Sequence, residues 1–279
     1  MRKTEFIEAM KAHAEQYGEV VVQDIVRPNV TYTGLMIKKE AGIPSPVVDL
    51  DWLYELFTMG HSTLNWCYEK IDEVLASKLE TKMDDFSPAD IFDWTKVKNK
   101  LFIKVFGKKP AGIYRKIEDL YLIPYIQVTS DDSAVTRVVP EFLDKWEVDE
   151  DTVFECAKAC QETIRPEKII SMGEQLGMED EIPMYIVSTK SGFNGAGAIF
   201  YDGICDRIRK KIGEDFYIIP SSIHEVITVP KSVSPSIRQL KAMVECVNAT
   251  EVREEDRLTN SIYTYDFDLK RVVKVEEVK

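Results

Sequence analysis

The chain has 279 residues, 44% hydrophobic and 30% charged, a balance typical of a globular protein with one large domain or two modest ones. Its 48 acidic and 36 basic residues give a net charge of −12, and the absence of a basic stripe disfavours nucleic acid as a partner. No apolar run approaches the roughly 18 residues of a membrane helix. The charged start lacks the apolar stretch of a secretory signal, and five scattered cysteines indicate reduced thiols in a cytosol.

The first elements along the chain alternate between helix and strand patterns. Apolar residues at helical spacing predict a helix over residues 4–17. Two runs rich in Val, Ile, Thr and Tyr, residues 19–26 and 29–40, predict a β-hairpin. A short strand is expected at residues 47–50, followed by a helix over residues 51–60 that ends at its glycine.

Two longer helices are predicted next. The first covers residues 62–78. The second starts with Ser87 as cap, Pro88 at the first helical position and Asp90 near the positive end of the helix dipole. Its apolar stripe continues to Val105.

The loop at residues 107–112 is the best candidate for a domain boundary. It would separate an N-terminal helix and hairpin portion, residues 1–110, from a C-terminal α+β portion, residues 111–279. A simple loop within one domain is the alternative.

The second half has a strand-strand-helix rhythm. Paired strands are expected at residues 119–128 and 133–139 around the turn TSDDS, followed by a helix over residues 148–164 capped by Asp149. After a polar connector (165–181), IPMYIVST and GAGAIFY predict another strand pair, with a helix after it that ends at Gly213. The unit therefore occurs twice, at about residues 119–164 and 182–213, and indicates an α+β fold of mostly antiparallel strand pairs packed by helices.

The last elements are a hairpin, a helix and another hairpin. The runs DFYIIP and EVITVP, residues 215–220 and 225–230, predict the first hairpin. A helix is expected from Ser234-Pro235, with Ile237, Leu240, Met243, Val244 and Val247 on its apolar face. The tail from residue 261 predicts a final hairpin that turns near Asp266 to Leu269.

Several blocks resemble an uncharacterised bacterial family. IPMYIVSTKSGFNGAGAIFY, DFYIIPSSIHEVITVP, VNATEV and IYTYD, with TGLMIKKE and VVDLDWLYELFTMG before them, are similar to domain-of-unknown-function family 5688 of the Firmicutes. The C-terminal half is more faintly similar to domain-of-unknown-function family 1444. The resemblance implies a bacterial, cytosolic setting and brings no established activity, cofactor or site residue.

One segment has the side chains from which hydrolases build their sites. Ser221, Ser222 and His224 lie between the runs DFYIIP and EVITVP, and Glu225 is the first residue of the second run. A Ser-His-acid device needs a hydroxyl, a base and an acid that converge in space, and adjacent His and Glu on a strand do not supply the last pair. The alternative is a structural turn whose tip is held by serine hydroxyls.

Other motifs fail on spacing. Gly192, Gly195 and Gly197 do not match a dinucleotide fingerprint, so turn geometry and close packing explain them better. Three dispersed histidines and the lone helical pair Cys156 and Cys160 make a poor metal site. The acids of VDEDTVFE and GMEDEIP follow no calcium-loop pattern. We therefore expect no cofactor and no bound metal.

Two classes of function are consistent with these patterns. The first is a non-enzymatic binding or adaptor module that contacts a protein partner through a sheet face or a loop end. We expect no membrane among its partners. The second is a hydrolase-like enzyme with Ser221 or Ser222 as nucleophile, His224 as base and an acid from elsewhere in the fold. A regulator of nucleic-acid processing is a third class, and it would need a concentrated basic face.

Overall fold

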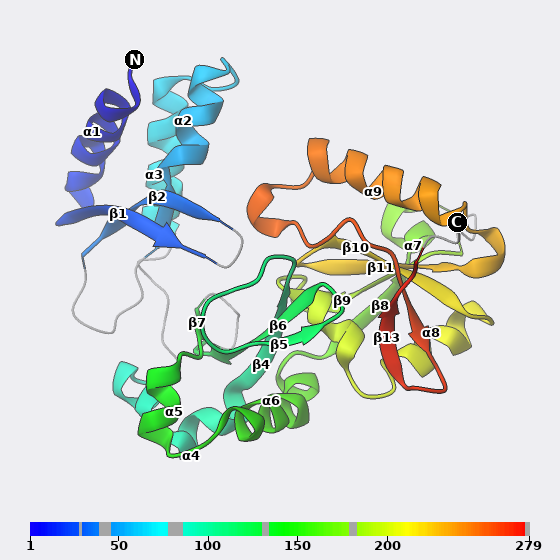
Figure 1. Cartoon of the computed structure of the whole chain (residues 1–279). Coiled ribbons are helices and arrows are strands. Elements are labelled where there is room, and N and C mark those ends of the chain that lie inside the picture. The colour runs from blue at the N-terminus through cyan, green and yellow to red at the C-terminus, as the bar shows by residue number, and fades with distance from the viewer. Residues whose placement is uncertain (28–29, 39–45, 78–85, 130–133, 179–182, 277–279) are drawn as a thin grey trace. The chain divides into compact units, whose positions relative to one another are not determined.

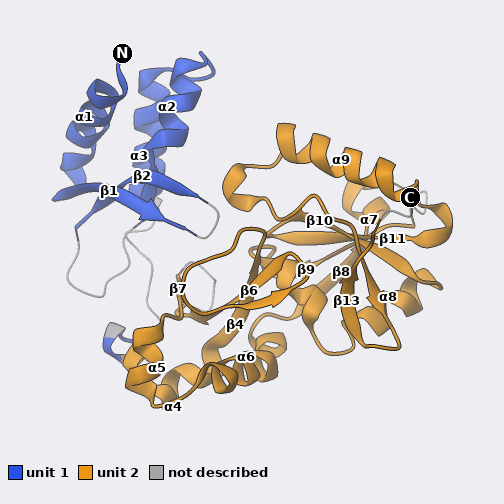
Figure 2. Cartoon of the chain, in the orientation of Figure 1, with its two compact units in different colours: residues 1–89 blue, residues 90–279 orange. Residues whose placement is uncertain are grey.

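The structure is a computed structural model that describes residues 1–27, 30–38, 46–77, 86–129, 134–178 and 183–276. It divides into two compact units, unit 1 at Met1–Ala89 and unit 2 at Asp90–Lys279 (Figure 2).

Unit 1 is a small antiparallel sheet packed by helices. Its sheet has the order β1-β2-β3, and the register of β1 and β2 continues without a shift from Val20 opposite Ile37 to Val26 opposite Thr31. The elements are α1 Lys3–Ala14, η1 Glu15–Tyr17, β1 Val20–Val26, β2 Thr31–Ile37, β3 Val47–Asp49, α2 Leu50–Thr58 and α3 Leu64–Ser77. The Asp49 carboxylate caps α2 by accepting hydrogen bonds from the backbone N–H groups of Asp51 and Trp52, each at 3.0 Å.

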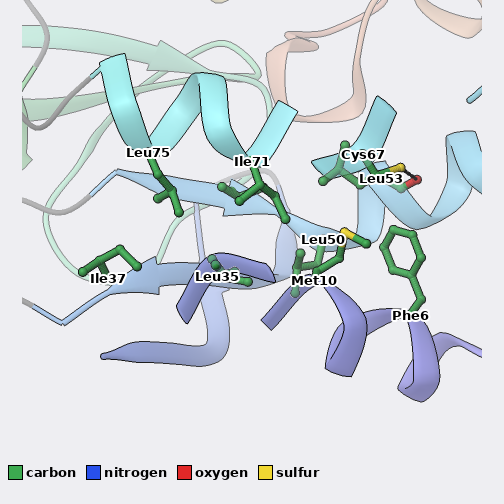
Figure 3. Close-up of a cluster of buried hydrophobic side chains, with 11 residues drawn as sticks. Phe6, Met10, Leu35, Ile37, Leu50, Leu53, Cys67, Ile71 and Leu75 are labelled. Atoms are coloured by element: carbon green, nitrogen blue, oxygen red, sulfur yellow. Dashed lines mark hydrogen bonds between the residues drawn. The ribbon is translucent and has the colours of Figure 1, made fainter. Parts of the chain in front are cut away.

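The core of unit 1 collects one apolar face from each of these elements. Figure 3 shows Phe6 and Met10 of α1, Leu35 and Ile37 of β2, Leu50 and Leu53 of α2, and Cys67, Ile71 and Leu75 of α3 directed toward one another. All nine are buried. The predicted helical stripes at residues 4–17 and 62–78 are thus confirmed as core faces.

Within the described residues of unit 2 the strands form two antiparallel sheets. One has the order β4-β6-β5, with β7 also on β6, and the other has the order β13-β12-β10-β11-β9-β8 (Figure 1). The strands are β4 Leu101–Phe106, β5 Arg115–Ile117, β6 Leu120–Gln127, β7 Val135–Arg137, β8 Glu167–Ser171, β9 Tyr185–Thr189, β10 Phe216–Ser222, β11 Glu225–Pro230, β12 Tyr263–Asp266 and β13 Arg271–Lys274. The helices are η2 Pro88–Phe92, α4 Trp94–Val97, η3 Lys98–Lys100, α5 Pro140–Trp146, α6 Glu150–Ile164, α7 Met172–Leu176, η4 Gly195–Phe200, α8 Ile204–Ile212, η5 Lys231–Val233, α9 Ile237–Thr250 and η6 Glu254–Asp256.

Strand β10 separates two parts of the core. Tyr217 and Ile219 of β10 pack against Leu240 and Val244 of α9. The alternate residues, of which Ile218 is one, are buried on the opposite face of the sheet. This alternation follows from the period of two along a strand.

The α+β class of mostly antiparallel strands and packed helices is confirmed. No helix in the described part of the chain has the length and apolar character to cross a membrane.

The continuous helix predicted from Ser87 to Val105 is wrong, because residues 88–100 form the three short helices η2, α4 and η3, and Asp93 caps α4. Residues 101–106 form β4, which pairs with β6 along its whole length. Every third or fourth residue up to Val105 is apolar by coincidence, because a strand buried on both faces is apolar at nearly every position. The loop at residues 107–112 leads from β4 toward β5 and therefore lies inside unit 2, whereas the compact units divide after Ala89.

The prediction of a second strand-strand-helix unit at residues 182–213 is wrong. GAGAIFY forms η4 instead of a strand, and β9 pairs with β11 and with β8, which lies in the supposed connector. Gly197 explains the close packing of η4, because a Cβ atom there would lie 2.7 Å from the Ile103 carbonyl oxygen. The repeat of about residues 119–164 is therefore not reproduced at residues 182–213.

Two further predictions need smaller corrections. Helix α9 begins at Ile237 with Ser236 as its cap, and Met243 and Val247 of the predicted apolar face are 58% and 47% exposed. Parts of the predicted turn at residues 129–133 and of the acidic segment GMEDEIP lie outside the described residues. The Asp149 cap of α6 is confirmed, since its carboxylate accepts the Thr152 backbone N–H at 2.8 Å.

A half-buried carboxylate ties the last two strands to the β5–β6 turn. Asp119 accepts hydrogen bonds from the Ser261 hydroxyl at 2.6 Å, from the Lys274 ammonium at 2.9 Å and from the Tyr263 hydroxyl. Burial raises the pKa of Asp119, but the three donors together outweigh burial and hold the pKa below its usual value. Burial and the carboxylate raise the pKa of Tyr263, so this phenol stays protonated and acts as a donor.

Candidate functional site

The predicted site residues lie at the end of the β10–β11 hairpin. The strands pair in register from Phe216 opposite Pro230, with an irregularity between Pro220 and Ser222, and Ser222 is paired with Glu225. Ile223 and His224 form the two-residue turn. The Ser222 hydroxyl accepts the His224 backbone N–H at 3.1 Å, which is the local bond by which serine stabilises turns.

The backbone of the turn is bonded to segments remote in sequence. The His224 carbonyl accepts from the Gly195 N–H at 3.0 Å and from the Ser188 hydroxyl at 2.7 Å. The Ile223 carbonyl accepts from the Ala196 N–H at 3.1 Å, and the Ile223 N–H donates to the Asp256 carbonyl at 2.8 Å. These bonds hold the tip rigidly between the β9–η4 loop and η6.

Gly195 permits this close approach. A Cβ atom at this position would lie 2.2 Å from the Ser188 hydroxyl oxygen and 2.5 Å from the Thr189 nitrogen. A side chain at this position would therefore push the loop away from the tip. The close-packing explanation offered for the glycines from the sequence agrees with this geometry.

Both ring nitrogens of His224 have partners. Nδ1 accepts the backbone N–H of Asn194 at 3.1 Å, and Nε2 lies 3.4 Å from the Asp256 Oδ1. A neutral ring must then carry its proton on Nε2, where it faces the carboxylate. The His224 side chain is 33% exposed, and the edge of the ring meets Phe193 at a centroid distance of 6.0 Å.

The structure brings together some of the predicted residues and separates others. His224 meets an acid, but that acid is Asp256 and not Glu225. Neither the Ser221 nor the Ser222 hydroxyl is hydrogen-bonded to the His224 ring in the part of the chain described, and Ser222 is engaged by the backbone. The Glu225 side chain forms no hydrogen bond or ion pair with any described residue.

Asp256 and Asn194 are the residues that sequence reasoning missed. Asp256 is one of several acids in the polar run REEDR, and nothing in that run distinguishes it from its neighbours. Asn194 acts through its backbone N–H, for which any residue other than proline would serve. Asn194 has a left-handed backbone conformation, with a φ of 49°, which asparagine adopts more readily than most residues. An asparagine in the sequence can therefore indicate such a turn, but it does not indicate that the N–H group donates to His224.

A small apolar cavity lies on the other side of the hairpin. Val105 of β4, Ile199 of η4, Ile218 and Pro220 of β10, and Leu258 are among its lining residues, and its free volume is about 10 Å³. This is close to the minimum that admits one water molecule, and the apolar lining offers a water few partners. The cavity is a packing gap and does not accommodate a ligand.

Phe193 is an exposed aromatic residue at this end. Its side chain is 62% exposed, while its carbonyl accepts a hydrogen bond from the buried guanidinium of Arg165. Arg165 itself lies over the Phe102 ring, with the guanidinium carbon 4.3 Å from the ring centroid. The loop thus has a backbone anchored in the core and an aromatic side chain in solvent.

No three His, Cys, Asp or Glu side chains in the described ranges gather closely enough to hold a metal ion. Cys156 and Cys160 share α6 as expected, and the Cys160 thiol donates to the Leu101 and Cys156 carbonyls, each at 3.0 Å. Burial raises the pKa of the Cys160 thiol, which favours its protonated form.

The fold and the site define an α+β protein with a rigid loop end built around a histidine and carboxylate pair. The chain belongs to the family of unknown function DUF5688, whose model matches residues 3–267. No curated protein and no solved structure shows significant similarity to the chain.

Proposed function

We propose that the protein is a non-enzymatic binding or adaptor module that contacts a protein partner through its loop end. The loop end comprises residues 191–195, the turn Ile223-His224 and η6. The observation that carries the proposal is Phe193, an exposed aromatic side chain on a backbone that Arg165, His224 and the β10–β11 turn hold in place.

Such a group is suited to binding because little conformational entropy remains to be lost. Aromatic side chains that enter a partner's pocket dominate many protein interfaces, and a preorganised loop reduces the ordering cost. The contact of Phe193 with the His224 ring further limits its rotation. The expected partner offers an apolar pocket for the phenyl ring.

The test is native mass spectrometry on the full chain isolated from its host, as wild type and as Phe193→Ala. We expect a protein mass with the wild type and at least a tenfold weaker complex with Phe193→Ala, the usual effect of removing a dominant aromatic contact. Phe92→Ala is a matched control, because Phe92 is 52% exposed and also makes one edge-to-face contact, with Phe142. A wild-type chain without a partner, or equal loss in both variants, would refute the proposal.

One observation favours the alternative, a hydrolase-like enzyme. Asp256 supplies the acid from elsewhere in the fold that the pair of Ser222 or Ser221 with His224 requires. In the present arrangement Nδ1 accepts the Asn194 N–H, so a serine hydroxyl would have to displace this bond before His224 could take its proton.

A panel of small activated esters tests this alternative. Hydrolysis abolished by both His224→Ala and Ser222→Ala, or by both His224→Ala and Ser221→Ala, and retained by Glu225→Ala would establish the enzyme. Hydrolysis that is absent from the wild type, or that survives His224→Ala, would dismiss it. The bacterial and cytosolic setting, the likeness to family 1444 and the lack of membrane or nucleic-acid partners stay predictions from the sequence.

A further inference from the structure

Strand β1 of unit 1 has one edge that no described strand covers, and Asp24 is the one charged residue within the strand. Among the described residues β1 pairs only with β2, and its sequence VVVQDIV contains no lysine, proline or glycine. The register with β2 has no bulge. Long, regular and apolar edge strands pair with other strands unless charges, prolines or bulges prevent it. Val26, at the end of the strand, is 78% exposed.

The backbone hydrogen bonds show which groups face this edge. At the two ends of the pair, the Glu19 carbonyl accepts from Lys38 at 2.7 Å, and the Arg27 N–H donates to Val30 at 2.8 Å. Odd-numbered residues of the strand therefore direct their N–H and C=O groups toward β2. Since direction alternates along a strand, the groups of Val20, Val22, Asp24 and Val26 point away from β2.

We propose that two copies of this chain associate by antiparallel pairing of their β1 strands, centred on Gln23. In this register Val22 of one copy faces Asp24 of the other, and Val20 faces Val26. These are the residues with outward backbone groups, so each such pair can exchange two hydrogen bonds. The occupant of the edge is thus a second copy of the chain.

The side chains fit the same register. Glu19 and Arg27 are equidistant from Gln23, so each copy places its acid opposite the base of the other. Val21 faces Ile25 in the same way, an apolar pair of the kind that stabilises antiparallel strands. Glu19 also pairs with Lys38 at 2.7 Å within the unit, and both of these side chains are more than half exposed. The intersubunit charge pairs therefore act mainly to select partner and register.

The pairing also preserves the faces of the sheet. Val20 and Val22 pack against the helix-covered core, and in this register they meet residues of the same face in the partner. A two-fold axis normal to the sheet relates the copies, so the helices of both copies cover the same side of one continuous sheet.

The register is tested with charge reversals in the full chain. Glu19→Arg alone places like charges opposite each other at both ends, and so does Arg27→Glu alone. Each is expected to raise the dimer dissociation constant about tenfold or more, measured by sedimentation equilibrium. Mixed one to one, the two variants regain opposite charges at both ends and should form a heterodimer. Failure of the mixture to associate would overturn the register.

The backbone pairing is tested with Asp24→Pro. Its proline removes an N–H that faces the free edge and leaves the bonds to β2 intact, so the monomer should fold and the dimer should be lost. Asp24→Ala keeps the N–H and should dimerise like the wild type. A wild-type chain that is monomeric at about 100 μM, far above typical dimer constants, overturns the proposal. A dimer insensitive to Asp24→Pro does so too, as does a β1 edge occupied by a different protein.

Discussion

At the scale of single residues, Asp119 accepts hydrogen bonds from three side chains of the C-terminal segment. Replacing it by asparagine keeps the shape but removes the charge that Ser261, Tyr263 and Lys274 share. Hydrogen bonds to charged groups are worth about 1.5–3 kcal/mol, and partial exposure reduces this through screening. We expect Asp119→Asn to lower the free energy of unfolding by about 1–2 kcal/mol at pH 7.

The same difference should depend on pH. The pKa of Asp119 is lower in the folded chain than in the unfolded chain, so its contribution is complete above the unfolded value of about 3.9. It is lost as the pH falls through the folded value. Urea unfolding at a series of pH values should show wild type and Asp119→Asn converging in acid. The exposed Asp144 gives a control, Asp144→Asn, which removes one carboxylate elsewhere in the chain.

Gly195 allows a second test at this scale. Gly195→Ala places a methyl group against Ser188 and Thr189 and should destabilise unit 2 by about 1–3 kcal/mol, the usual cost of overpacking. Thermal unfolding monitored by circular dichroism measures this. Ser188→Ala in the same chain should not restore stability, because the contact with the Thr189 nitrogen remains. Full recovery in the double variant would contradict the geometry.

At the scale of elements, the start of α9 is sharply defined. The Ser236 hydroxyl accepts the Gln239 N–H at 3.3 Å, and the Gln239 side chain accepts the Ser236 N–H at 3.1 Å, which completes a capping box. Ser236→Ala should therefore cost about 1 kcal/mol in urea unfolding. Ser234→Ala is the matched control, since the Ser234 hydroxyl is buried without a partner in the described chain. An equal loss of unfolding free energy in both variants would contradict the role of Ser236 as the N-cap of α9.

Elements with one exposed face could be predicted from the sequence, and elements buried on both faces could not. The apolar stripes of α1, α3 and α6 are recognisable in the sequence because the opposite face of each helix is exposed to solvent and carries polar residues. Strand β4 is apolar at nearly every position, so its sequence fits the helical period as well as the period of a strand. Strand β8 was missed because EKIIS begins with two charged residues.

The local part of the candidate site can be predicted from the sequence, and the contacts from remote segments cannot. Its hairpin follows from two β-rich runs, and the polar turn between them is visible locally. The pairing of His224 with Asp256, and the occupation of Nδ1 by Asn194, depend on segments about 30 residues away in each direction. No local pattern encodes that meeting, so the hydroxyl, base and acid could be named as types but not assembled.

At the scale of the whole molecule, each unit has its own core and its own pair of tryptophans. The ring centroids of Trp52 and Trp66 are 6.1 Å apart in unit 1, and those of Trp94 and Trp146 are 5.4 Å apart in unit 2. Phe6→Ala should destabilise unit 1 by about 3–5 kcal/mol, as for other buried phenylalanines. Combined with Trp94→Phe and Trp146→Phe, it should shift the fluorescence transition to lower urea.

The complementary variant reports on unit 2. With Trp52→Phe and Trp66→Phe, the transition should be unchanged by Phe6→Ala if each core unfolds by itself. A shift of equal size in both backgrounds would show that the units unfold as one cooperative block.

Asp119 and its hydrogen-bond partners are far apart along the sequence, and this has a consequence for synthesis on the ribosome. All the buried side chains of the unit 1 core have emerged once Leu75 has left the ribosome, so this unit can fold while the rest is still being translated. Asp119 must wait for Lys274, which is 155 residues further along the chain. During that interval the nascent chain carries a finished unit 1 and an unfinished sheet whose strands β12 and β13 have not yet been made. Protection of this intermediate from premature contacts is therefore most needed late in translation.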